Sequence, residues 1–268
     1  MQRLAGHLLA TNYGSPTGIT TQDKDVRFLW NLTYWIAIPI GLIVIGLVVW
    51  CVVRYRHRPG REHIPHQFQY HIPIEATYTI VPIILVAIVF GFVYKAENRI
   101  DNVASNPSAQ VKVEGFQWGW RFTYLTVDGK DLAQQRQFQE VGSVANEPNL
   151  NDDAALPVLT LPSAVTVQLD LNTDDVNHSF YIPATLFKRD LIAGIHNTVD
   201  FNFVHTGQYI GECTQFCGTY HPYMRFMVHI LPPAQFSQWA SAQRPGSVTY
   251  AGKPVDSGIS PNTFGVGQ

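Results

Sequence analysis

The sequence predicts a two-helix membrane hairpin followed by one all-β domain. Three features predict this fold class. Two long apolar segments lie near the N-terminus, short β-branched and aromatic segments follow Val111, and the chain closes on a stretch rich in Gly, Ser and Pro. With 268 residues the chain is long enough to bury a substantial core. Its formal net charge of −2 disfavours nucleic-acid binding, which requires a strongly basic face.

Two segments have the length and apolarity of membrane-spanning helices. Residues 28–53 carry no charged side chain, and residues 72–94 carry only Glu75. A spanning helix needs about 20 mostly apolar residues, so both segments are long enough to cross a bilayer. Two buried helices in a soluble protein are the alternative, and the aromatic residues near the segment ends disfavour it. We therefore expect a transmembrane hairpin over residues 28–95.

The segment between the two spans sets the predicted orientation. Residues 54–71 hold four arginines against a single acidic side chain, Glu62. Short basic loops stay on the cytoplasmic side of a membrane. Both termini, and everything after residue 95, should therefore lie on the outer side of the cytoplasmic membrane. Residues 1–27 form an outward-facing segment whose apolar patch is too weak to predict a secretory signal.

Strand-like segments after Val111 predict a sandwich or barrel, which we place at residues 96–244. These segments are β-branched and aromatic, alternate in part, and are separated by turn residues. Their sequences are VKVEGFQWGWRFTY, VTVQLDLN, HNTVDFNFV, GQYIGEC and MRFMVHIL. Residues 127–162 are polar and are expected to form a loop on this domain. Residues 245–268 are expected to form a flexible tail with little regular structure.

The stretch GECTQFCGTYHPYM, residues 211–224, holds two of the three cysteines of the chain. On the outer side of a membrane, two nearby cysteines most often form a disulfide, but a disulfide leaves His221 and Met224 unexplained. A structural zinc site uses thiolate and imidazole and also leaves Met224 unused. Copper combines thiolate, imidazole and thioether ligands. Because Cys213 and Cys217 are both present, the pattern favours two bridged copper ions, each with one histidine and one weak ligand.

A second histidine ligand would then have to come from an upstream segment. The candidates within the β domain are His178, His196 and His205. His178 lies in the turn-like DDVNHSFYIP, and an upstream loop is where a cupredoxin barrel places one of its histidine ligands. His205 ends a predicted strand and is expected to be a surface residue, whereas His196 lies in a loop. The remaining weak ligand could be a backbone carbonyl between the cysteines, that of Gln215.

DVNHSFYIP and GECTQFCGTYHPYM together resemble the copper-binding signature of cytochrome c oxidase subunit II. The two-span hairpin fits this family, IEATYTIVP resembles the start of its second helix, and FQWGWRFTY resembles its aromatic segment. The segments LFKRD and CGTYH are most similar to the actinobacterial branch of the family. The resemblance covers most of the chain. It implies a cupredoxin-like, Greek-key barrel that carries a dinuclear copper A centre.

The resemblance also implies a ligand set for that centre. It consists of five side chains and one backbone carbonyl: Cys213, Cys217, His178, Met224, His221 and the carbonyl of Gln215. The two cysteines would bridge both coppers. His178 and Met224 would complete one copper, and His221 with the carbonyl would complete the other.

Three further residues match functional positions of the family. Trp118, the first tryptophan of FQWGW, matches the residue through which the family receives electrons from cytochrome c, and an aromatic residue of the barrel interior is the alternative. Asp175 matches an acidic position near the cytochrome c docking face. Glu75 matches a glutamate near the mouth of a proton pathway, and a purely interfacial position is its alternative.

Two residues depart from the family pattern. The family usually has a glutamate between the cysteines, whose carboxylate helps to bind magnesium or manganese at the interface with subunit I. Gln215 is a poorer ligand for a hard cation, so we expect the interfacial Mg or Mn site to be weak or absent. Gly119 stands where a bulkier residue is common and is expected to reshape the electron-entry surface.

The residues and the resemblance together predict the electron-entry subunit of a respiratory, proton-translocating cytochrome c oxidase. Expected partners are subunit I with its haem and copper B, subunit III, the lipid bilayer, and as electron donor a cytochrome c or a c-type cytochrome of complex III. The sequence contains no CxxCH motif and therefore predicts no covalent haem. Two alternatives stay open: the electron-entry subunit of a related haem–copper nitric oxide reductase, and a membrane-anchored copper chaperone.

Overall fold

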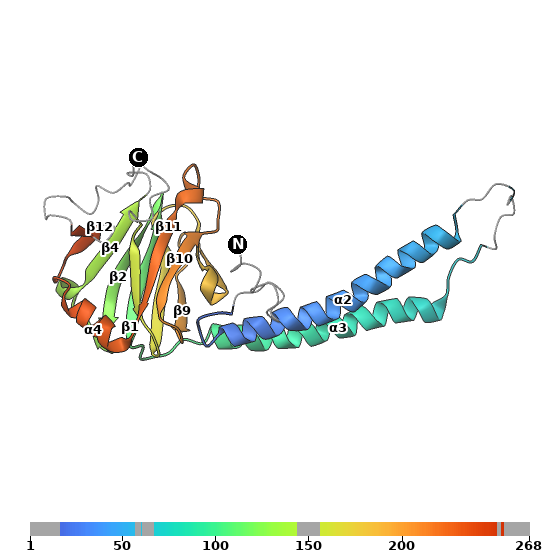
Figure 1. The fold of residues 1–268 in the computed structure, drawn as a ribbon, viewed down its shortest axis with the longest axis horizontal. Coiled ribbons are helices and arrows are strands. Elements are labelled where there is room, and N and C mark those ends of the chain that lie inside the picture. The colour runs from blue at the N-terminus through green and yellow to red at the C-terminus, as the bar shows by residue number, and fades with distance from the viewer. Residues whose placement is uncertain (1–16, 57–59, 61–66, 144–155, 251–252, 255–268) are drawn as a thin grey trace, which may run out of the picture. The chain divides into compact units, whose positions relative to one another are not determined.

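A computed structural model describes most of the chain, as two compact units (Figure 1). One unit contains the two long helices and the other contains the β domain. The described residues are 17–56, 60, 67–143, 156–250 and 253–254. Parts of several predicted segments lie outside them: residues 1–16 of the N-terminal segment, 57–59 and 61–66 of the basic loop, 144–155 of the polar interval, and 251–252 and 255–268 of the tail.

The two predicted spans are helices, and both extend beyond the predicted bounds. Helix α2 covers Asp23–Arg54 and helix α3 covers Ile72–Ile100. The extra turns are polar, so a search for apolar runs does not find them. The most apolar 18-residue windows have mean hydropathies of 2.9 and 2.4, and none of their residues is buried. Uncovered apolar helices of this length indicate a membrane anchor.

The β domain is a sandwich of two sheets, with strand orders β13-β12-β4-β2-β1-β6-β9 and β5-β11-β10-β7-β8 among the described residues, and β3 paired with β2. The first sheet contains β1 (Ala109–Phe116), β2 (Gly119–Val127), β3 (Lys130–Asp131), β4 (Phe138–Ser143), β6 (Thr166–Thr173), β9 (Asn197–Asn202), β12 (Val248–Tyr250) and β13 (Lys253–Pro254). The second contains β5 (Val158–Pro162), β7 (His178–Ile182), β8 (Phe187–Leu191), β10 (Gly207–Cys213) and β11 (Arg225–Leu231).

The connections between strands cross from one part of the sandwich to another. Strand β1 pairs in parallel with β6, and β5 pairs in parallel with β11, although each pair is far apart in the sequence. Parallel neighbours cannot be joined by a tight hairpin. This crossing topology confirms the predicted fold class. The helix α4 (Pro233–Ser241), which the sequence did not suggest, follows β11 and buries Phe236 and Ala240.

The loop predicted at residues 127–162 contains strands, and the predicted tail contains two short ones. Residues 127–162 were expected to form a loop, yet they contribute β4 and β5. Their polar residues concealed the strands: Glu140 of β4 is buried and accepts a hydrogen bond from the Val158 N–H. The predicted tail, 245–268, also contains a strand, because β12 pairs in parallel with β4. Pairing with a distant strand cannot be read from local composition.

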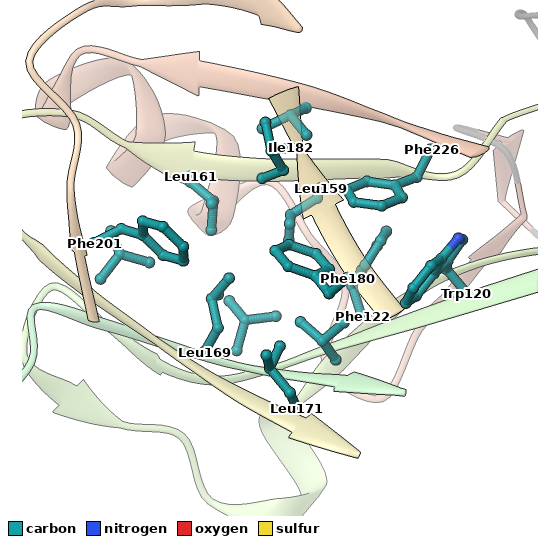
Figure 2. Packing of buried hydrophobic residues seen from close by; sticks show 14 of the residues in the cluster. Trp120, Phe122, Leu159, Leu161, Leu169, Leu171, Phe180, Ile182, Phe201 and Phe226 are labelled. Atoms are coloured by element: carbon teal, nitrogen blue, oxygen red, sulfur yellow. The ribbon is translucent and has the colours of Figure 1, made fainter. Parts of the chain in front are cut away.

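The core lies between the two sheets, and four of its large aromatic side chains lie together in it (Figure 2). Trp120, Phe122, Phe180 and Phe226 are fully buried. The ring centroids of Trp120 and Phe226 are 5.1 Å apart, as are those of Phe180 and Phe226. The Trp120 Nε1–H donates a hydrogen bond of 3.4 Å to the backbone carbonyl of Met224, in the segment between β10 and β11. The rigid core thus extends directly into the cysteine-containing loop.

Gly119 lies where β2 comes closest to β4. A Cβ atom at this position would lie 2.1 Å from the carbonyl oxygen of Gly142 and 2.8 Å from the Phe116 ring. Packing between β2 and β4 therefore requires glycine at position 119 of this chain, where the family commonly has a bulkier residue. Phe116 occupies the space that a larger side chain would need.

We expect Gly119→Ala to destabilise the protein by about 1–3 kcal/mol, the usual cost of overpacking, because the backbone of β4 cannot give way. Thermal unfolding of the detergent-solubilised chain, followed by near-ultraviolet circular dichroism, measures this effect. Lys130→Ala, at an exposed position of β3, is the control and should change stability by less than about 0.5 kcal/mol. Equal unfolding midpoints for the two variants would show that the β2–β4 contact tolerates a side chain.

Candidate metal centre

The predicted ligands come from three neighbouring strands of one sheet. His178 begins β7, Cys213 ends β10, and Met224 immediately precedes β11. Strand β10 lies between the other two, so its end is adjacent to both. The Cys213 N–H donates a 3.0 Å hydrogen bond to the Met224 carbonyl, which closes the base of the loop formed by residues 214–224. The loop therefore starts and ends at one fixed point.

Cys213, at the base of the loop, and Cys217, within it, are free thiols. Their Sγ atoms are 3.9 Å apart, whereas a disulfide bond is about 2.05 Å long. Both side chains are buried. The disulfide considered from the sequence is therefore absent from the described structure, and two sulfur atoms face the same small volume.

The other predicted donors surround these sulfurs. The Nδ1 of His178 lies 3.8 Å from the Cys213 Sγ, and the Gln215 carbonyl oxygen lies 3.3 Å from the same atom. The Nδ1 of His221 and the Sδ of Met224 lie 3.5 Å and 3.8 Å from the Cys217 Sγ. All six donors suggested by the resemblance are thus gathered in one place. Five of them are side chains and one is a backbone carbonyl.

The competing histidines lie elsewhere. His196 and His205 are exposed on loops, as the sequence suggested for His205. His178 is fully buried. Among the described His, Cys, Asp and Glu residues, the group close enough to share a metal ion is His178, Cys213 and Cys217, whose ligand atoms lie within 4.8 Å of one another.

Glycine creates the space for the His178 ring. A Cβ atom on Gly115 of β1 would lie 3.1 Å from two ring carbons of His178, which is tighter than nine in ten real contacts of a Cβ atom. The ring Nε2 lies 3.0 Å from the Asp175 Oδ1. The hydrogen bonds from His178 and from the Gln117 N–H outweigh the effect of burial and lower the pKa of Asp175. Burial alone would lower the pKa of His178. The hydrogen bonds of His178 with Asp175 and Cys213 outweigh burial and raise that pKa.

The thiols are strongly coupled electrostatically. The pKa of Cys213 is lowered to about 3, chiefly because the Cys217 thiol donates a hydrogen bond to its thiolate. The pKa of Cys217 is raised, because its proton is held by that thiolate and because burial disfavours a second charge. The pair can carry one negative charge alone and needs added positive charge to carry two. Together with two imidazoles and a thioether, this donor set fits copper.

Trp118 lies against the same loop. Its Nε1–H donates a 2.9 Å hydrogen bond to the Cys217 carbonyl, and the side-chain amide of Gln117 donates one of 2.8 Å to the same oxygen. Its ring packs edge to face against Tyr220, with centroids 5.0 Å apart. Gly218 has φ +117°, and a Cβ there would lie 2.9 Å from the indole. Trp118 is partly buried, whereas Trp120, Phe122 and Tyr124 of the same segment are fully buried.

The two acidic residues suggested by the resemblance both accept hydrogen bonds from backbone N–H groups. The Glu75 carboxylate accepts a 2.7 Å hydrogen bond from the His71 N–H, at the first turn of α3. This contact caps the helix and also fits the interfacial alternative. The Asp175 carboxylate contacts His178, a ligand candidate, as well as the backbone of Gln117. Sequence reasoning missed Gln117 and Gly218, whose role depends on long-range contacts.

Comparison with known proteins identifies similar chains. The family model described as "Cytochrome C oxidase subunit II, periplasmic domain" matches residues 109–231. A probable cytochrome c oxidase subunit 2 of Nocardia farcinica is 30% identical over 280 residues, covering 87% of this chain and 75% of that protein. Another, from Streptomyces avermitilis, is 32% identical over 247 residues, covering 84% of this chain and 77% of that protein. A crystal structure of the periplasmic domain of subunit II of cytochrome oxidase from Bradyrhizobium japonicum aligns with a TM-score of 0.40 and 22% identity, over 52% of this chain and 95% of that one.

We expect His178→Ala to remove most of the copper that the protein binds, because the buried imidazole is part of the donor cluster. His205→Ala, an exposed histidine of the same domain, should leave the copper content unchanged. Elemental analysis after dialysis of both variants measures this difference, and circular dichroism verifies that each is folded. Equal copper content in the two variants would exclude His178 as a ligand.

Proposed function

The chain belongs to the cytochrome c oxidase subunit II family, and on that premise we propose that it is the electron-entry subunit of a respiratory haem–copper oxidase. The observation that carries this proposal is the donor cluster, in which two imidazoles, one thioether and one backbone carbonyl surround two buried thiols. A copper centre held there would supply one-electron redox chemistry at the outer face of a membrane enzyme. Oxygen reduction and proton translocation would take place on the partner chains.

The proposed division of the ligands between two copper ions is the one that the family resemblance implies. Cys213 and Cys217, whose sulfurs face one another without forming a bond, would be the bridging ligands. His178 and Met224 would complete one ion, and His221 with the Gln215 carbonyl would complete the other. The contacts of Met224 with Cys213 and Trp120 hold the loop closed at its base. A loop fixed in this way favours electron transfer, because its ligands move little when the charge changes.

Trp118 is the proposed point of electron entry. Its indole reaches a ligand through a single hydrogen bond, to the carbonyl of Cys217. The ring is only partly buried, so part of it is accessible to a donor. The proposed donor is a cytochrome c or a c-type cytochrome of complex III. The proposed acceptor is haem in subunit I.

The membrane part has a proposed orientation and proposed partners. The hairpin lies in the cytoplasmic membrane with the basic loop inside and the β domain and both termini outside. The uncovered apolar surfaces of α2 and α3 would contact lipid, subunit I and subunit III. Glu75 is proposed to lie near a proton-pathway mouth. Because Gln215 lacks a carboxylate, the interfacial magnesium or manganese site is proposed to be weak or absent.

The two alternatives have less support. The named relatives are cytochrome c oxidase subunits, which favours the oxidase over the nitric oxide reductase. A copper chaperone does not need Met224, whose thioether lies 3.8 Å from a cysteine sulfur. The complete donor set therefore supports a resident centre that transfers electrons.

The cysteines and the methionine should respond differently to substitution. We expect Cys217→Ser to lose the dinuclear centre, because one thiolate cannot bridge two ions symmetrically. Met224→Leu should retain both coppers and shift the reduction potential, since a thioether is a weak ligand that tunes the metal. Copper content and redox titration of the two variants test these roles, and equal copper loss would contradict them.

Trp118→Gln should slow reduction by cytochrome c by more than an order of magnitude while leaving docking affinity nearly unchanged. An indole between donor and ligand supplies electronic coupling, whereas docking depends on the charge and area around it. Stopped-flow mixing of reduced cytochrome c with the copper-loaded protein, at several ionic strengths, separates the two effects. A normal rate with copper content intact would make Trp118 a packing residue and would remove the proposed entry point.

A further inference from the structure

One carboxylate connects the histidine ligand candidate to the turn that carries Trp118. The Oδ1 of Asp175 lies 3.0 Å from the His178 Nε2 and accepts a 2.6 Å hydrogen bond from the Val176 N–H. Its Oδ2 accepts a 2.8 Å hydrogen bond from the backbone N–H of Gln117. Both oxygens of this side chain therefore have fixed partners inside the domain.

The contact with Asp175 determines which nitrogen of His178 can bind metal. The ring Nδ1 faces the Cys213 Sγ at 3.8 Å, and the Nε2 faces Asp175. A proton on Nε2 that is donated to the carboxylate leaves the Nδ1 lone pair free for a cation. Outer carboxylates fix the tautomer and the ring orientation of ligand histidines in this way and make them stronger donors. Gly115 packs against the His178 ring, where a Cβ atom would lie 3.1 Å from the ring carbons.

The contact with Gln117 extends the same arrangement to the proposed entry point. Gln117 precedes Trp118, and the side chains of both residues donate to the carbonyl of Cys217. The contacts form a closed ring. Asp175 contacts the Gln117–Trp118 turn, and this turn contacts Cys217. Cys217 contacts Cys213, which contacts His178, and His178 contacts Asp175 again. Movement of one member would disturb both the ligand ring and the indole.

We propose that Asp175 is a positioning residue that holds His178 and the Trp118 turn in one fixed geometry, rather than chiefly a docking charge. This inference rests on the proposed function. The Asp175 side chain is 32% exposed, yet both of its oxygens have partners within the domain, among them the imidazole. A change at Asp175 should therefore act on the copper centre through His178.

The adjacent Asp174 provides a matched control. The Asp174 side chain is 33% exposed and the Asp175 side chain is 32% exposed. Asp174 pairs with Arg121 at 2.8 Å, whereas Asp175 contacts His178. Asp174→Asn and Asp175→Asn thus remove the same charge from neighbouring positions, and only the second change weakens the support of His178.

The test compares the copper-loaded full-length protein in three forms: unsubstituted, Asp175→Asn and Asp174→Asn. We expect Asp175→Asn to raise the reduction potential, because a less electron-rich imidazole stabilises oxidised copper less well. It should also change the histidine-nitrogen coupling seen by electron–nuclear double resonance. Copper affinity should fall about 10-fold or more, as is typical when such a partner is lost. Asp174→Asn should show none of these changes.

Two results would overturn the proposal. Equal shifts of potential in both variants would reduce the effect of Asp175 to its charge. The second result is an Asp175→Asn protein whose reduction potential, nitrogen coupling and copper affinity are unchanged but which associates more weakly with cytochrome c at low ionic strength. That result would make Asp175 a docking residue. Failure of the unsubstituted protein to bind copper would instead refute the proposed function itself, and the three-way comparison distinguishes that outcome. Asp175→Ala, which has no acceptor at all, should exceed Asp175→Asn in every measured shift.

Discussion

The close approach of two buried thiols is the constraint on which the rest of the site depends. The Cys213 and Cys217 sulfurs lie 3.9 Å apart, too far for a disulfide and close enough for one thiolate to suppress ionisation of the other thiol. Such a pair is satisfied by a cation of soft character, which supplies the positive charge that the second thiolate needs. The surrounding imidazoles, thioether and carbonyl then have a clear purpose as further ligands. Without that cation, only one of the two buried thiols can ionise, because the Cys213 thiolate holds the proton of Cys217.

The fold holds this pair of cysteines in place through a few direct contacts between residues that are far apart in the sequence. Strand β10 delivers Cys213 between β7 and β11, so three ligand segments meet at one end of a single sheet. The indole of Trp120 joins the aromatic core to the Met224 carbonyl, and the Cys213 N–H bonds to the same carbonyl. Glycines then allow aromatic rings to approach the backbone: Gly115 accommodates His178, and Gly218 accommodates Trp118. The ligands are thus supported by the core on one side and by the Gln117–Trp118 turn on the other.

The sequence was most informative where local chemistry alone determines structure. Apolar runs predicted α2 and α3. The spacing of the cysteines, His221 and Met224 predicted that residues 213–224, the donor loop, bind metal. Wherever a residue is used through a distant partner, local patterns failed. The buried Glu140 made β4 look like a loop, and β12 exists only because it pairs with β4. Asp175 matched a docking position in the resemblance, yet its carboxylate contacts His178 and Gln117, which lies 58 residues away in the chain.

The central claim is that the donor loop holds two copper ions that share one electron. Electron paramagnetic resonance of the oxidised, copper-loaded full-length chain, combined with metal analysis of the same sample, tests this most directly. The account predicts two coppers per chain and a hyperfine pattern from two equivalent copper nuclei coupled to a single unpaired electron. A single copper at saturation, with the hyperfine pattern of one nucleus, would contradict it.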